Sequence, residues 1–158
     1  MSLLSIFQWL AAAPLFDVMR NSKWGFASVE MLHLVALTAL GGAILIGDLA
    51  ILGIGLSRTV SSKVGRELAP LFWMGLAGAV VSGALLVSAE AMKCYYHPAF
   101  RLKMLLFVLV LAFYLTLHRR AQDIAPGTQP GRLAKLSAVV SLTLWLGVGL
   151  AGRAIGFL

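Results

Sequence analysis

The sequence is poor in charge and in cysteine. Only 12% of its 158 residues are charged, while 60% are hydrophobic, whereas soluble domains carry about 25% charged residues. With a mean hydropathy of +0.92, the chain has too few polar groups to cover a globular surface, so we expect lipid to be its solvent. The single cysteine, Cys94, excludes an internal disulfide and every cysteine-clustered metal or iron–sulfur site. No serine or cysteine lies in a nucleophile motif, which argues against a hydrolase.

Acidic residues are also scarce. Six of them face 13 lysines and arginines, for a net charge of +7. The basic residues stand singly or in pairs between apolar runs, without the continuous basic face that nucleic-acid binding requires. They are better explained as loop residues that orient membrane helices. We therefore expect the bilayer, and no nucleic acid, as a partner.

Four apolar runs are long enough to cross a hydrocarbon core, which takes about 20 residues. They cover about residues 28–57, 68–91, 99–118 and 136–157. Residues 2–20 are too short and too interrupted, at Pro14, to span, so we expect an interfacial helix there. The sequence thus predicts one all-α domain over residues 1–158, a four-transmembrane-helix bundle in a bacterial inner (cytoplasmic) membrane.

Lysine and arginine counts near the span ends predict the topology. The loops after the first and third spans are the more basic, through Arg58, Lys63, Arg66, Arg119, Arg120, Arg132 and Lys135. This bias places those loops in the cytoplasm and both termini in the periplasm. The half of the bilayer nearer the termini is called the outer half below.

Ionisable residues inside spans are costly and usually face the bundle interior. At a rise of about 1.5 Å per residue, one group falls in the outer half and forms the predicted outer polar cluster. Such a cluster either pairs helices or receives a ligand: its cations would hold a carboxylate such as a haem propionate, and its histidine would ligate iron. Its members are Glu30, His33, Glu90, Arg101, Lys103 and Arg153.

A second group falls in the inner half. This predicted inner polar cluster pairs Asp48 with His118, with Tyr114 about one turn away, and a coupled Asp–His pair is also suited to proton handling. His33 and His118 should lie about 25 Å apart along the membrane normal, so as haem ligands they belong to separate sites. A single bis-histidine haem would need His33 with His97, and otherwise Met92 or Met104 would be the second ligand.

Small residues recur at four-residue spacing in the second and fourth spans, as Gly75, Ala79 and Gly83 and as Gly147 and Ala151. This spacing lets helices approach closely in lipid, either within the bundle or against a partner. The string G-x-G-x-x-G at residues 147–152 lies inside a span and lacks the strand that a dinucleotide site requires. The polar stripes of the first and third spans are expected to face each other.

Two motifs carry a family resemblance. The first runs from Trp24 through Glu30, His33-Leu34 and Asp48-Leu49 to Leu52-Gly53, and the second is Pro98-Ala99-Phe100-Arg101-Leu102-Lys103-Met104 followed by His118-Arg119. The chain resembles an uncharacterised family of small bacterial four-span membrane proteins. In layout it is loosely similar to copper-resistance D and cytochrome b-like membrane proteins. The resemblance implies that Glu30, His33, Asp48, Lys103 and His118 are the family's main positions. His97 stands where the pattern has asparagine, which weakens a haem role for it.

Three functions remain open from the sequence. The leading hypothesis is a subunit without catalytic activity of its own that binds haem b or quinone for electron transfer, because a compact bundle holds cofactors between its helices. The alternative is a cofactor-free anchor or assembly protein, as a homo-oligomer or in a larger membrane complex. A small proton or solute transporter is third, because no internal repeat supports it.

Overall fold

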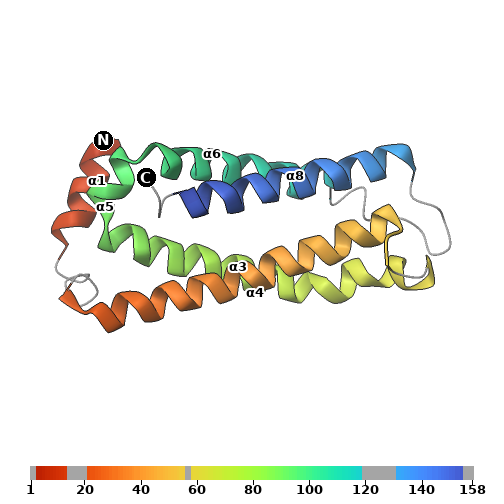
Figure 1. Cartoon of the computed structure of the whole chain (residues 1–158), viewed down its shortest axis with the longest axis horizontal. Coiled ribbons are helices and arrows are strands. Elements are labelled where there is room, and N and C mark those ends of the chain that lie inside the picture. Colours follow the sequence, from red (N-terminus) through yellow and green to blue (C-terminus); the bar gives the residue numbers. More distant parts are fainter. Residues whose placement is uncertain (1–2, 14–20, 56–57, 119–130, 155–158) are drawn as a thin grey trace.

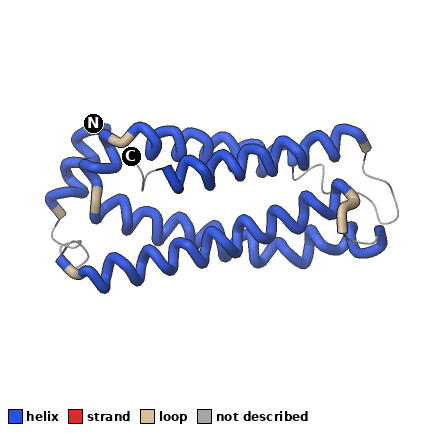
Figure 2. Tube along the Cα trace, in the orientation of Figure 1, coloured by secondary structure: helices blue, strands red, loops and turns tan. Residues whose placement is uncertain are grey.

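The computed structural model describes residues 3–13, 21–55, 58–118 and 131–154, and these are helical apart from short caps and turns (Figure 2). The described elements are α1 (Leu3–Ala12), α3 (Lys23–Leu52), α4 (Arg58–Ala89), α5 (Ala91–Tyr96), α6 (Pro98–Phe113), the π-helical turn η2 (Tyr114–His118) and α8 (Arg132–Ala154). The predicted all-α class is confirmed.

Four of these helices are long and apolar enough to cross a membrane, namely Trp24–Leu52, Glu67–Ala89, Pro98–Thr116 and Arg132–Ala154. The protein is therefore a multi-pass membrane protein. The first span ends earlier than predicted, because Gly53 has φ 77°, a left-handed conformation that terminates helices. By contrast, α4 begins at Arg58, well before its apolar part.

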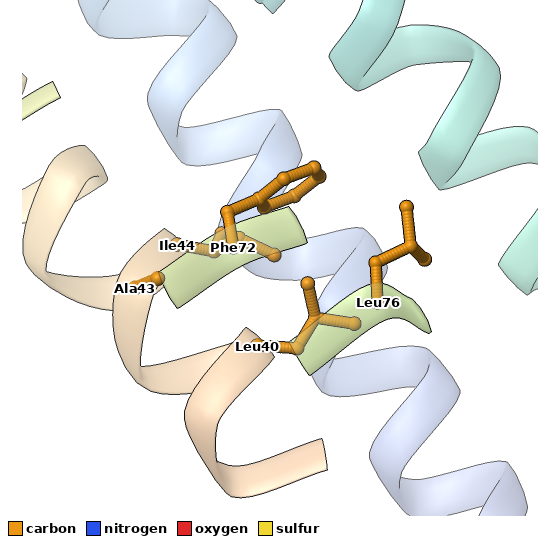
Figure 3. Close-up of a cluster of buried hydrophobic side chains, with 5 residues drawn as sticks. All are labelled: Leu40, Ala43, Ile44, Phe72 and Leu76. Carbon is orange, nitrogen blue, oxygen red and sulfur yellow. The ribbon is translucent and has the colours of Figure 1, made fainter. Parts of the chain in front are cut away.

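The helices pair in chain order. In Figure 1, α3 runs beside α4 and α6 runs beside α8, and α3 also contacts α8. We expected the polar stripes of the first and third spans to face each other, but α3 pairs mainly with α4, and α6 with α8. The first and third spans meet through side chains. Phe107 and Leu111 of α6 pack against a central cluster formed by α3 and α4, which is shown in Figure 3 and consists of Leu40, Ala43, Ile44, Phe72 and Leu76.

Glycines allow α4 to lie directly on α3. A Cβ atom on Gly75 would come 2.7 Å from the backbone nitrogen of Leu40, and one on Gly78 would come 3.0 Å from Cβ of Ala36. The small-residue stripe of α4 is therefore used inside the bundle, and the alternative that it offers a partner surface is wrong for Gly75. On α8, Gly147 likewise faces Leu106 of α6.

Two short helices gather at the outer end of the bundle (Figure 1), where α1 packs against α5. Phe7 and Tyr95 make the aromatic contact between them, with ring centroids 5.4 Å apart. Trp9 of α1 is largely exposed, as in helices that lie at a membrane interface. The short helix α5 separates the second span from the third and was not predicted from the sequence.

Candidate ligand-binding site in the outer half

His33 lies on α3 with a half-buried ring that faces α4. Its Nδ1 is 2.9 Å from Oγ of Ser82, and the Ser82 hydroxyl donates its only hydrogen to the backbone carbonyl of Gly78. Oγ of Ser82 must therefore accept from His33, so Nδ1 of His33 carries a hydrogen. In the neutral ring, Nε2 is then left with the lone pair.

Gly83 packs against the same ring, at its Cε1 atom. A Cβ atom at Gly83 would lie 3.1 Å from Cε1 of His33, so the ring would have to shift by a few tenths of an ångström to admit an alanine there. Ser82 and Gly83 thus fix both the tautomer and the position of the His33 ring. The backbone of Ala79, also on α4, is a further hydrogen-bonding neighbour of the ring.

Lys103 of α6 is the cation that interacts electrostatically with His33. Its charge acts on the His33 ring, and its Nζ lies 3.3 Å from where Gly152 of α8 would carry a Cβ atom. The side chain is partly buried, yet within the described part of the chain it has no ion-pair partner. A partly buried cation without a carboxylate is suited to a ligand that offers an acceptor or a negative charge.

The other members of the predicted outer polar cluster are dispersed. Glu30 and Arg153 are exposed, and Arg153 already has an interaction partner. Glu90 forms an ion pair of 3.1 Å with Lys93. Arg101 donates through Nε to the carbonyl of Tyr95 at 2.9 Å and lies over its ring. Of the six residues, His33 and Lys103 lie within electrostatic range of each other.

Cys94 on α5 lies within electrostatic range of Lys103. Partial burial raises the pKa of the Cys94 thiol, and the Glu90 carboxylate raises this pKa further, while Lys93 and Lys103 act in the opposite direction. The thiol is therefore less ionised than an exposed one at the same pH.

The second haem ligands considered above are not placed beside His33. His97 lies at the junction of α5 and α6 and, with Met92, lines an open groove to which His33 does not contribute. Met104 is exposed. The described residues contain no group of three metal-ligating side chains.

In the inner half, Asp48 is fully buried, at 0% exposure, and it takes part in a polar or electrostatic interaction. Tyr114 stacks on Phe72 with ring centroids 4.3 Å apart, and it opens the π-helical turn. The side chain of His118 lies outside the described structure, so its pairing with Asp48 stays a prediction.

Sequence reasoning missed Ser82, a fully buried residue that orients His33. A signal was available, because Ser82 falls on the same helical face as Gly75 and Ala79. A hydroxyl on a small-residue face that packs against a histidine-bearing helix is a candidate partner for that histidine.

The comparisons with known proteins give a family without a function. The sequence model of a family of unknown function (DUF6644) matches residues 7–158, and the chain belongs to this family. This confirms the expectation of an uncharacterised family. No curated protein and no solved structure matches the chain.

Proposed function

We propose that this member of the DUF6644 family is a membrane subunit that binds a quinone headgroup at His33 and Lys103. One observation carries the proposal. The hydrogen bond to Ser82 leaves Nε2 of the neutral His33 ring with a lone pair, within electrostatic range of a lysine that has no ion-pair partner in the described part of the chain. The site therefore combines a hydrogen-bond acceptor with a donor.

A quinone requires such a combination. In the oxidised quinone, the carbonyl oxygens accept hydrogen bonds, and the Lys103 ammonium can donate one to them. In the reduced quinol, the hydroxyls donate hydrogen bonds, and Nε2 of His33 can accept one from them. The residues next to His33 on the outer face of α3, Leu32 and Leu34, are exposed on the bundle surface. A lipid-dissolved headgroup can therefore approach the half-buried ring from the bilayer.

Haem b is the second candidate, and the same histidine favours it. Histidine ligands of metals usually donate their other ring nitrogen to a neighbouring group, as Nδ1 of His33 does to Ser82. His33 would hold the iron and Lys103 a propionate, and the haem would supply one-electron transfer. Two features fit less well: Gly83 leaves little room beside Cε1, and His97 lies in a separate groove.

Binding of a short-chain quinone tests the proposal. We would titrate the purified protein with decylubiquinone and follow the quenching of tryptophan fluorescence. Because hydrogen bonds to charged groups contribute about 1.5–3 kcal/mol, Lys103→Met should weaken binding by at least about tenfold, and His33→Ala should also weaken it. The matched controls are Lys135→Met, on the exposed surface at the opposite end of the bundle, and His97→Ala.

The outcomes separate the candidates. Equal affinity for the Lys103 and Lys135 variants would refute the quinone site. A Soret band in the purified protein that is lost in His33→Ala would replace quinone by haem. Neither binding nor a Soret band would leave the cofactor-free anchor as the supported function.

A further inference from the structure

The inner end of the bundle carries two basic helix starts. There α4 begins at Arg58 and α8 begins at Arg132, both at the opposite end from α1 and α5 (Figure 1). Residues 58–67 and 131–135 together contain five lysines and arginines and one acid, Glu67. This end of the molecule is therefore strongly positive.

On α8, cations and apolar side chains alternate on the exposed surface. Arg132 and Lys135 are exposed, whereas Ala134 between them is buried. Leu133, next to Arg132, is 83% exposed, and Leu136, next to Lys135, is 60% exposed. This surface thus offers positive charge together with apolar contact area, and a lipid with a charged headgroup and acyl chains matches both.

On α4, the cations belong to a continuous helix. The sequence predicted a loop after the first span, but the helix starts at Arg58 and continues into the span that begins at Glu67. At 3.6 residues per turn, Arg58, Lys63 and Arg66 occupy one half of the helix circumference. The buried residue Val64 falls in the other half. The basic half of this segment is therefore on the side of the helix away from its packed side.

The depth of these cations indicates the kind of partner. The apolar spans begin at Glu67 on α4 and at Arg132 on α8. At a rise of about 1.5 Å per residue, Arg66 and Lys135 lie within about 5 Å of these span ends along the helix axes. That is the level of the lipid headgroups. A lipid headgroup is present at this depth, whereas a soluble partner would have to displace it.

The charge at this end is also available for binding. Among the residues that the structure describes, neither Arg132 nor Lys135 takes part in an ion pair. At the outer end, by contrast, Lys93 is paired with Glu90, and Arg153 has an interaction partner. The inner end is therefore where the bundle can attract an external anion.

We propose that the basic starts of α4 and α8 bind the headgroups of anionic phospholipids at the inner boundary of the membrane. Clusters of lysine and arginine next to a span attract anionic headgroups, while the exposed Leu133 and Leu136 contact the acyl chains. The surface lies at the opposite end of the bundle from His33 and Lys103, so it does not depend on the quinone proposal.

Lipid-dependent unfolding tests this surface. We would measure the thermal unfolding midpoint of the full chain in neutral detergent, with added phosphatidylglycerol or with phosphatidylcholine of the same acyl chains. Phosphatidylglycerol should raise the midpoint more, because a ligand of the native state stabilises it. Each cation near an anionic surface strengthens binding by about fivefold. The double variant Arg132→Gln/Lys135→Gln should therefore need at least about tenfold more phosphatidylglycerol for half of the effect.

The matched control is the double variant Lys93→Gln/Arg153→Gln, which removes the same charge at the outer end and should respond as the wild type does. Equal responses of the wild type to the two lipids, or of the two double variants to phosphatidylglycerol, would overturn the proposal. Glycerol phosphate should not raise the midpoint, and an equal rise would identify a soluble anion instead of a lipid. The preference should disappear at about 1 M salt, where charges are screened beyond about 3 Å, and a preference that persists would contradict binding by charge.

Discussion

At the scale of single residues, the Ser82 hydroxyl sets the tautomer of the His33 ring. An isolated imidazole exchanges between two tautomers, but Ser82 commits its hydrogen to Gly78 and so accepts from Nδ1 of His33. The lone pair of the neutral ring is thereby placed on Nε2 without a charged partner. This matters inside a membrane span, where a carboxylate used for the same purpose would have to be buried at a high cost.

Cys94 allows the outer end to be tested by pH. Because burial and Glu90 raise the pKa of its thiol, less thiolate is present at a given pH, and alkylation by iodoacetamide should be slower than for an exposed thiol and should increase at a higher pH. Glu90→Gln removes the carboxylate, lowers this pKa and should speed alkylation at pH 8 by roughly two- to fivefold.

Lys93→Gln is the opposite control, since Lys93 lowers the same pKa and its loss should slow alkylation. The measurement is the rate of carbamidomethylation followed by mass spectrometry. Faster alkylation in both variants would show that loosening of α5, and not charge, controls the thiol.

At the scale of helices, the contact between α3 and α4 depends on the absence of side chains. Gly75 faces the backbone of Leu40, which cannot move aside as a flexible side chain can. In lipid, where apolar burial does not drive association, this close packing is a main source of attraction between helices.

Gly75→Ala should therefore destabilise the protein, by about 1–3 kcal/mol, because its Cβ atom would lie 2.7 Å from the Leu40 nitrogen. The matched control is Gly149→Ala on α8, where no atom lies within 4 Å. Alanine there should be neutral or stabilising, by up to about 1 kcal/mol. Thermal unfolding in detergent measures both variants, and equal midpoints would show that the helices are not in the close contact described.

At the scale of the whole molecule, a buried apolar layer lies between the predicted outer and inner polar clusters. Leu40, Ile44 and Val110 are buried in that layer, and Phe107 and Leu111 pack against it. Ions and protons cross membranes along polar or hydrated paths, so a transporter would need water to enter this layer. The layer is compatible with binding at the outer site alone.

Orientation in the membrane is also a property of the whole molecule, and it stays a prediction from the basic loops. In a Cys94→Ser background, we would place single cysteines at Gln8→Cys on α1 and at Gly131→Cys before α8, both at exposed positions at opposite ends of the bundle. With both termini periplasmic, a membrane-impermeant maleimide should label the first in intact spheroplasts. The second should be labelled only after lysis, and the reverse pattern would invert the topology.

The sequence by itself determined the helical class and the four spans, and it predicted two polar groups at different depths. These follow from hydropathy and helical rise, which act locally along the chain. Helix limits were less predictable, because the end of α3 depends on the left-handed conformation of Gly53. The short helix α5 was missed for a different reason, because its six residues carry too little periodicity.

Only the tertiary structure decided which polar residues meet. Glu30, His33, Glu90, Arg101, Lys103 and Arg153 were predicted to share a depth, yet most of them point apart, and His33 lies within electrostatic range of Lys103. The packing of α3 on α4 also places Ser82 beside His33. Depth is set by the number of residues along a helix, whereas contact is set by how neighbouring helices pack, and that packing depends here on glycines such as Gly75 and Gly83.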